Sequence, residues 1–360
     1  MPLDGWDHLE LWVGNAKQAA YYYEHAMGFA RVAYAGPETG VRDRASYVLE
    51  QGDIRLVLTS GLCSDSEVVR FAARHGDGAK DVALLVPDAT AAYGEATARG
   101  ATGVREPRWV EDEHGRVELA TIATYGENVH TFVNRAEYGG PFLPGFVSLS
   151  PNGNRDGGAG LVAIDHVVGN VELGKMDHWV EFYERVFGMV NIIHFGDEQI
   201  QTEYSALMSK VMAGGGGKIK FPINEPAEGK RKSQIDEYLE FNEGPGVQHI
   251  ALQSENIVGT IETLKERGLA FLDTPDTYYA EVEARVGEID ESYDDLHRLR
   301  ILADRDEDGY LLQIFTKTAQ DRPTLFFEVI ERHGATTFGE GNFKALFESI
   351  EREQALRGNL

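Results

Sequence analysis

The feature that most constrains the fold of this chain is an internal repeat, because self-similarity means that one structural unit occurs twice. Residues 7–15 resemble residues 165–170, and each segment precedes an aromatic-rich helical pattern that ends at a glycine. Further on, residues 76–84 resemble 244–252, and both are predicted to be buried strands followed by a helix. A fold with two copies of one α+β unit is therefore predicted.

The chain also shows where one copy ends and the next begins. Residues 148–160 are rich in Pro, Gly, Asn and Ser, which is typical of a connection between domains. We expect an N-terminal domain at 1–147 and a C-terminal domain at 161–360. A further helix is predicted after Gly341, because apolar side chains there recur on one face.

Composition excludes several classes of protein. The chain has 59 acidic and 34 basic residues, and its formal charge of −25 repels nucleic acids and anionic membrane surfaces. The lone cysteine, Cys63, supports neither an intrachain disulfide nor a cysteine-based zinc site. Neither a signal peptide nor an apolar run of about 20 residues is visible. We expect a cytoplasmic homo-oligomer, a dimer or a tetramer, without nucleic-acid or membrane partners.

Three predicted strands of the second copy each carry one chemically reactive side chain on an apolar face. Strand alternation places His166, His249 and Glu328 among buried apolar neighbours. A carboxylate in such a place is unfavourable unless it is paired or bound to a metal. Two imidazoles and one carboxylate are the set that holds non-haem Fe(II) with open coordination positions, where a substrate and O₂ can meet.

A plainer interpretation of these side chains remains open at this point. A strand histidine is more often a hydrogen-bonded core residue than a ligand, and a buried Glu328 is often salt-bridged, here to Arg322 or Arg332. Spacing alone does not decide between a metal site and such a core arrangement.

The first copy serves as an internal comparison for the candidate ligands. His8 and Asp81 fall where the second copy has its two histidines, and the position of the glutamate falls near Val133 or Asn134. The first copy therefore lacks the third, anionic ligand. We expect it to be a structural half without metal.

Several long stretches of the second half are similar to those of one enzyme family. They are residues 205–209, 221–226, 231–235, 246–252, 304–306, 311–317, 321–324, 327–332 and 341–343. Through them the second half resembles 4-hydroxyphenylpyruvate dioxygenase, of the vicinal-oxygen-chelate superfamily. The first half resembles it more loosely, mainly through residues 13–16.

This resemblance implies a fold and a set of site residues. The implied fold is two tandem repeats of βαβββ-type units that form open mixed β-barrels, with the C-terminal helix over the second barrel. His166, His249 and Glu328 match the iron ligands of the family. The implied catalytic residues of the polar pocket are Ser205, Asn224, Gln234, Gln248 and Gln313, and the implied substrate-binding residues are Pro222, Phe315, Phe343 and Phe347.

Within that set, Phe315 and Phe343 match the aromatic pair that flanks the substrate ring, and Phe347 resembles a pocket-closing residue. Gln248 is a doubtful member, because it neighbours His249 and simple strand alternation points it away from the metal. Gln313 shares a face with Phe315 and fits the pattern better.

The implied reaction is the Fe(II)-dependent conversion of 4-hydroxyphenylpyruvate and O₂ into homogentisate and CO₂, in tyrosine and phenylalanine catabolism. The 2-keto acid supplies the electrons by losing CO₂, so no other reductant is needed. Two alternatives stay open. One is a 4-hydroxymandelate synthase, which acts on the same substrate at its benzylic carbon. The other is a non-catalytic ligand-binding protein of the same fold.

Overall fold

The computed structural model describes residues 1–149, 158–195, 206–227 and 232–358. The first half contains, in chain order, β1 (Gly5–Trp12), α1 (Ala16–Met27), β2 (Ala30–Ala35), β3 (Arg44–Gln51), β4 (Ile54–Gly61), α2 (Glu67–His75), β5 (Gly78–Leu85), α3 (Ala89–Ala98), β6 (Gly103–Asp112), β7 (Gly115–Ala123), β8 (Val129–Asn134) and β9 (Val147–Ser148). The second half contains β10 (Leu161–Asn170), α4 (Met176–Phe187), β11 (Val190–Phe195), β12 (Ala206–Gly214), β13 (Ile219–Ala227), α5 (Gln234–Phe241), β14 (Gly246–Ser254), α6 (Ile257–Glu266), α7 (Asp276–Val286), α8 (Tyr293–Leu299), β15 (Leu302–Arg305), β16 (Tyr310–Phe315), β17 (Phe326–His333) and α9 (Phe343–Arg357).

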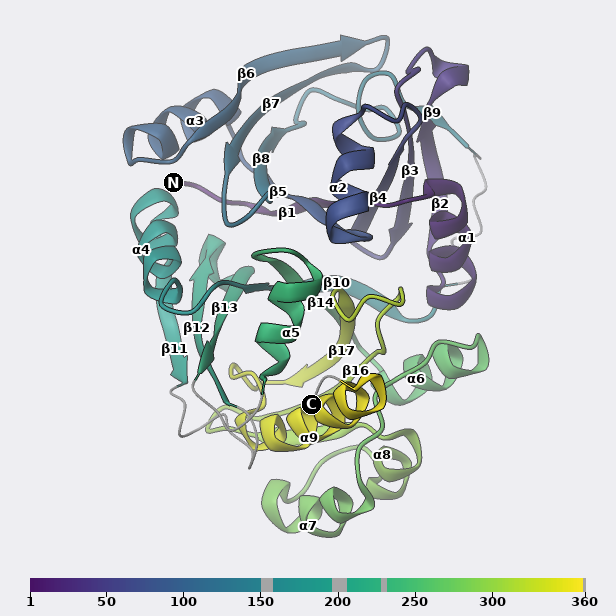
Figure 1. The fold of residues 1–360 in the computed structure, drawn as a ribbon, viewed down its shortest axis with the longest axis vertical. Coiled ribbons are helices and arrows are strands. Elements are labelled where there is room, and N and C mark those ends of the chain that lie inside the picture. Colours follow the sequence, from purple (N-terminus) through teal and green to yellow (C-terminus); the bar gives the residue numbers. More distant parts are fainter. Residues whose placement is uncertain (150–157, 196–205, 228–231, 359–360) are drawn as a thin grey trace.

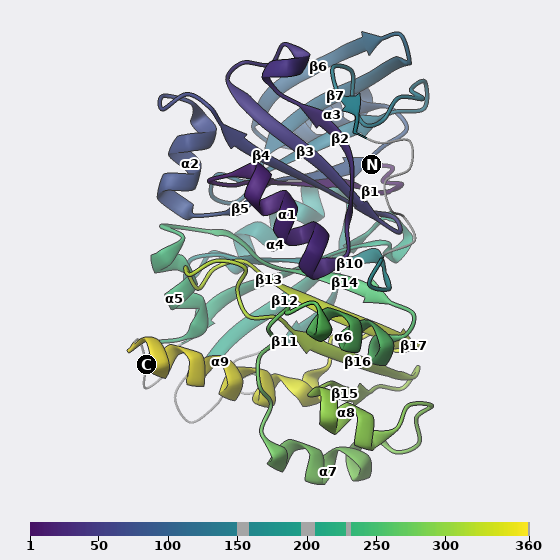
Figure 2. The same ribbon diagram turned by 90° about the vertical axis from the view of Figure 1, so that its right-hand side faces the viewer.

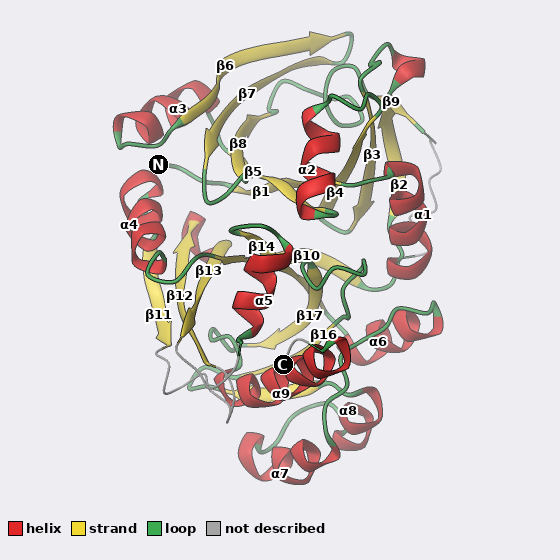
Figure 3. Ribbon diagram, viewed as in Figure 1, coloured by secondary structure: helices red, strands yellow, loops and turns green. Residues whose placement is uncertain are grey.

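The strands form two curled, mixed sheets, one above the other in Figure 1. The first sheet has the order β6-β7-β8-β5-β1-β4-β3-β2-β9, and the second has the order β11-β12-β13-β10-β14-β17-β16-β15. Figure 3 shows helices interspersed around both sheets. The predicted α+β class with two repeated, open barrels is confirmed.

Each half contains two βαβββ units. In the second half these are β10-α4-β11-β12-β13 and β14-α6-β15-β16-β17. The two units meet at the antiparallel pair of β10 and β14, and β1 and β5 pair in the same way in the first half. The strands at this central junction carry the site described below.

Apolar side chains at helical spacing fix the helices against the sheets. In α4, Val180, Tyr183 and Phe187 are all buried, and the helix ends at Gly188, whose φ of 71° is the left-handed conformation that glycine adopts most easily. One continuous apolar core includes residues of both halves. At their junction, the Tyr183 hydroxyl lies 2.8 Å from Nε2 of His130 in β8.

The second half differs from the first by an insertion. The chain passes from α3 directly to β6 in the first half, whereas α7 and α8 lie between α6 and β15 in the second. These two helices lie at the end of the molecule far from the first half (Figure 2). Among the described residues, no helix is long and apolar enough to cross a membrane.

Candidate metal centre

The three candidate ligands come from three neighbouring strands and meet at one point. Nε2 of His166 lies 3.2 Å from Oε2 of Glu328, and Nε2 of His249 lies 3.3 Å from the same oxygen. All three residues are buried, and their ligand atoms lie within 4.8 Å of one another. The two imidazoles and one carboxylate therefore face a common centre.

Strand pairing explains this convergence of residues that are far apart in the sequence. In the antiparallel pair of β10 and β14, His249 lies opposite Val168, two residues from His166. In the parallel pair of β14 and β17, Glu328 lies opposite Ala251, two residues from His249. Because side chains two residues apart share a face of a strand, the three ligands lie on one side of the sheet.

Electrostatics keep the carboxylate of this centre ionised. Burial alone would raise the pKa of Glu328, but the charges and hydrogen bonds of His166 and His249 outweigh it and lower that pKa to about 2. Burial lowers the pKa of His249. Burial also acts to lower the pKa of His166, but Glu328 and Asp165 outweigh it and raise that pKa.

A second layer of polar contacts orients His166. Its Nδ1 lies 2.7 Å from Oδ1 of Asp165, and a carboxylate can only accept, so Nδ1 donates and Nε2 remains available to a metal. Arg332 donates two hydrogen bonds to the same carboxylate, at 2.8 and 2.9 Å, and Lys220 lies 3.2 Å from it. Burial acts to raise the pKa of Asp165, but the hydrogen bonds with His166 and Arg332 lower it well below its usual range.

Among the described residues, the ion pairs of Glu328 include neither Arg322 nor Arg332. Within the described residues, its ion pairs are with the two histidines. Arg332 pairs with Asp165, and Arg322 donates to the backbone carbonyls of residues 73 and 74. A buried carboxylate that is paired with two imidazoles is well suited to a cation.

Gln248 lies on the same cavity as His249, contrary to the expectation from strand alternation. Val168 pairs with His249 and Gly169 pairs with Val247, so Gln248 is an extra residue in β14. Such a bulge breaks the alternation and turns two consecutive side chains toward one face. Oε1 of Gln248 lies 2.9 Å from Nδ1 of His249 and accepts a hydrogen bond from it, which again leaves Nε2 for a metal.

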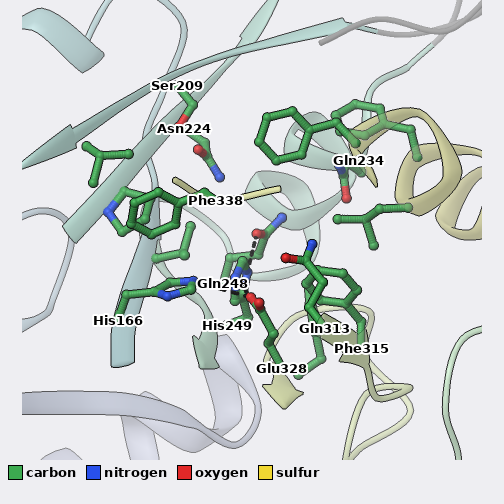
Figure 4. A pocket seen from close by; sticks show the side chains of 17 residues that line it. His166, Ser209, Asn224, Gln234, Gln248, His249, Gln313, Phe315, Glu328 and Phe338 are labelled. Atoms are coloured by element: carbon green, nitrogen blue, oxygen red, sulfur yellow. Dashed lines mark hydrogen bonds and ion pairs between the residues drawn. The ribbon is translucent and has the colours of Figure 1, made fainter. Parts of the chain in front are cut away.

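The three ligands open onto a cavity with aromatic and amide walls (Figure 4). Every predicted site residue except Ser205 lines this cavity, and Ser205 lies outside the described residues. Beside the three ligands and Gln248, they are Pro222 and Asn224 from β13, Gln234 from α5, Gln313 and Phe315 from β16, and Phe343 and Phe347 from α9. The structure thus places these residues together, while the role of each remains a prediction.

Six further residues line the cavity that sequence reasoning did not single out. They are Val168, Ser209, Val211, Phe326, Phe338 and Leu346. Ser209 pairs directly with Asn224 across β12 and β13, so the register of this hairpin was the signal that could have found it. The Phe338 ring lies 4.9 Å from the His166 ring, edge to face, and no strand or helix pattern marks it.

One polar atom in the wall has no partner in the described structure. Oε1 of Gln313 is buried and accepts no hydrogen bond from a described residue. Gly339 makes this packing possible, since its φ is 76° and a Cβ there would lie 2.7 Å from that oxygen. An unpaired buried acceptor is unfavourable, so a donor on a bound ligand would stabilise it.

Helix α9 covers the cavity. Phe347 packs with Ile235 of α5 in a small apolar cluster that also includes Phe343. At the far end of the helix, Arg357 donates to both carboxylate oxygens of Glu237, at 3.2 and 2.6 Å. Helix α9 therefore forms one wall of the cavity and contacts α5 near both of its ends.

The first half repeats the supporting contacts without the ligand set. Asp7 lies 2.6 Å from Nδ1 of His8 and receives two hydrogen bonds from Arg135, at 2.6 and 2.7 Å. Ala83 pairs with His8, and the register of β5 with β8 then places Thr131 where the second half has its glutamate. The expected position near Val133 or Asn134 is wrong, because strand register rather than local similarity sets the equivalence.

The first half has no equivalent of the metal centre. Thr131 donates its backbone N–H to Asp81, which occupies the place of the second histidine. Burial raises the pKa of Asp81 to about 6. Among the described residues of this half, no three potential ligands converge.

The three candidate ligands leave one side of the centre facing the polar and aromatic cavity. Such an arrangement can bind a redox metal and a small aromatic acid together. The donor set is a facial triad of two histidines and one carboxylate, which is the set used for non-haem Fe(II).

The chain is similar to known families, curated proteins and solved structures. Residues 1–142 match the family described as "Hydroxyphenylpyruvate dioxygenase, HPPD, N-terminal", and residues 163–314 match the "Glyoxalase/Bleomycin resistance protein/Dioxygenase superfamily". Curated proteins named 4-hydroxyphenylpyruvate dioxygenase from Aspergillus fumigatus and Dictyostelium discoideum are each 48% identical over 99% of this chain, which covers 94% and 100% of those proteins. A solved structure of a mutant 4-hydroxymandelate synthase from Streptomyces coelicolor is 36% identical with a TM-score of 0.89, over 98% of this chain and 100% of that one.

Proposed function

The chain belongs to the 4-hydroxyphenylpyruvate dioxygenase family and is an oxidoreductase, and from this we propose that its second-half cavity converts 4-hydroxyphenylpyruvate and O₂ into homogentisate and CO₂. The observation that carries the proposal is the buried centre of His166, His249 and Glu328 at the wall of an aromatic cavity. The reaction balances without a further reductant, because the keto acid loses CO₂ and both atoms of O₂ enter the products.

We propose Fe(II) as the metal, held by Nε2 of His166, Nε2 of His249 and a carboxylate oxygen of Glu328. The separations of these atoms and the ionised state of Glu328 support it. When bound, Fe(II) supplies the redox chemistry that activates O₂ and the positive charge that attracts the 2-keto acid group.

The role of the surrounding chain is to hold the substrate and to exclude water. Phe315 and Phe343 lie on the cavity wall from β16 and α9 and are proposed to hold the phenyl ring between them. Asn224, Gln234 and Gln313 are proposed to orient the phenol and the polar intermediates. The unpaired oxygen of Gln313 supports this, because a phenolic hydroxyl is a donor.

Gln248 has a proposed role that depends on the bulge. Its amide oxygen fixes the imidazole of His249 with Nε2 directed to the centre. Pro222 and Phe347 are proposed to shape the substrate end of the cavity. Enclosure under α9 would keep the reacting groups dry and strengthen every electrostatic contact within.

The domain roles and the cellular setting are proposals too. We propose residues 1–147 as a structural domain, 148–160 as a linker and 161–360 as the catalytic domain, acting in tyrosine and phenylalanine catabolism. The lone cysteine fits a reducing compartment such as the cytoplasm. A homo-oligomer, a dimer or a tetramer, is proposed as the working form.

A 4-hydroxymandelate synthase is the second candidate, because a solved structure of that name has the same fold at 36% identity. The higher identity, 48%, to proteins named as dioxygenases favours the first candidate. A ligand-binding protein without catalysis is disfavoured by the intact set of three metal ligands.

Anaerobic reconstitution with Fe(II), followed by addition of 4-hydroxyphenylpyruvate and O₂, tests the proposal. We expect O₂ uptake equal to substrate consumed, and homogentisate as the product by mass and chromatographic retention. Hydroxymandelate as the product would favour the synthase. No O₂ uptake by iron-loaded, folded protein would contradict both enzymes.

A further inference from the structure

A second cluster of potential metal ligands lies outside the cavity, at the end of β17. Glu331 and His333 are two residues apart on that strand, on the face opposite to Glu328, and Glu291 comes from the segment between α7 and α8. Nε2 of His333 lies 3.0 Å from Oε1 of Glu331 and 3.1 Å from Oε1 of Glu291. The three ligand atoms lie within 4.8 Å of one another.

These distances also fit a shared cation. Nε2 of His333 makes a hydrogen bond with Oε1 of Glu331 at 3.0 Å, and Oε1 of Glu291 lies almost equally close to the same nitrogen, at 3.1 Å. Ligands about 2.1 Å from one ion, at angles of 90–109°, lie about 3.0–3.4 Å apart. The candidate active centre, with 3.2 and 3.3 Å, falls in the same range.

The second oxygen of each carboxylate is held by a further contact, as is typical of metal ligands. Oε2 of Glu331 accepts a hydrogen bond from the backbone N–H of Ile257 at the start of α6, at 2.6 Å. Oε2 of Glu291 accepts one from the hydroxyl of Tyr310, at 3.0 Å. The Tyr310 ring stacks on the His333 ring at 4.3 Å, with an interplanar angle of 5°. All three candidate ligands are therefore fixed in orientation.

The charge of the cluster is unbalanced. Within the described residues, the ion pairs of Glu291 and Glu331 are both to the one imidazole of His333. Arg305, which lies over the Tyr310 ring, donates instead to backbone carbonyls. Glu331 is 6% exposed, so its charge is poorly screened by water. A divalent cation would neutralise both carboxylates.

We propose that Glu291, Glu331 and His333 form a structural binding site for a divalent cation of the zinc class. Imidazole with carboxylate is a donor set that Zn²⁺ favours, and the partial exposure of His333 leaves room for water to complete the coordination. The ion would fasten residues 287–292, between α7 and α8, to the end of β17 in the second sheet. The first half lacks this insertion and has no need of such a fastening.

Metal counting tests this proposal. The chain is stripped with a chelator, dialysed against Zn²⁺, freed of excess ion and measured for zinc per chain. We expect about two Zn²⁺ for the native chain, one at each set of ligands, and about one for His333→Gln and for Glu291→Gln. A variant with His166→Ala and His249→Ala is expected to keep about one.

A matched control is His297→Gln on α8. Among the residues that the structure describes, His297 forms an ion pair with one carboxylate, that of Asp276 at 2.9 Å, so its replacement should leave the zinc count unchanged. If the folded double-alanine variant binds no zinc, the cluster is an ion pair only and the proposal is wrong.

Hydrogen exchange gives a second readout that is independent of catalysis. In the double-alanine variant, Zn²⁺ is expected to slow exchange of the amides of residues 287–292 by about tenfold or more. When the double-alanine variant also carries Glu291→Gln, Zn²⁺ should leave the exchange rate of these amides unchanged. Equal exchange rates with and without Zn²⁺ in the double-alanine variant would overturn the proposal.

Discussion

Replacing Asp165 with Asn should weaken metal binding at the catalytic centre, although Asp165 is not itself a candidate ligand. The carboxylate accepts from Nδ1 of His166 at 2.7 Å and from Arg332 at 2.8 and 2.9 Å. The side-chain amide of Asn carries one NH₂ donor group, whereas His166 and Arg332 both need an acceptor at this place. Turned toward His166, it favours the tautomer with the proton on Nε2, which cannot bind a metal. Turned the other way, it opposes the guanidinium.

The size of the effect follows from these contacts. Loss of such an orienting partner lowers metal affinity by about 10–100-fold, which is roughly 1.4–2.8 kcal/mol. Arg332 is left without its charge partner in a mostly buried place, since its side chain is 11% exposed. Breaking a buried ion pair from one side costs about 3–5 kcal/mol of folding free energy.

The first half supplies the control for this experiment. Asp7→Asn breaks the same contacts, to His8 and Arg135, in a half without a metal centre. Chelator competition with Co²⁺ measures metal affinity, and urea unfolding measures stability. Both variants should lose stability, but only Asp165→Asn should lose affinity. Equal affinity loss in both variants, or none in Asp165→Asn, would refute the reasoning.

Three further predictions concern the two halves and the covering helix. Glu328→Gln should lower turnover by orders of magnitude while circular dichroism stays native, because it removes the anionic ligand; near-native activity would contradict the site. Burial raises the pKa of Asp81 to about 6, so the folded chain binds a proton more tightly than the unfolded chain, and stability falls as pH rises from about 4 to 6. Asp81→Asn should therefore stabilise the chain at pH 7 by up to roughly 3 kcal/mol in urea titrations, with the difference vanishing near pH 4; a difference independent of pH would argue against this cause. Arg357→Gln should loosen α9 from Glu237, seen as faster hydrogen exchange in α9 and a higher KM, and unchanged exchange would show that the ion pair does not hold the helix.

The amino-acid sequence alone determined the repeat and the α+β class, and it marked three candidate metal ligands. His166, His249 and Glu328 could be singled out as candidates because each stands on an apolar strand face, and strand alternation is a local property that a short segment displays. Alternation left a core arrangement open, and the family resemblance pointed to metal ligands. The long matching stretches of the second half extended this recognition to the amides and aromatic residues of the cavity.

Only the tertiary structure decided what depends on strand register and on contacts between distant segments. The bulge at Gln248 turns this side chain toward the centre, and register places Thr131 of the first half where the second half has Glu328. Arg332 reaches Asp165 across the sheet, and a loop brings Glu291 to His333. Bulges, register and loop paths arise from pairing energies summed over whole strands, and the residues of one segment do not record them.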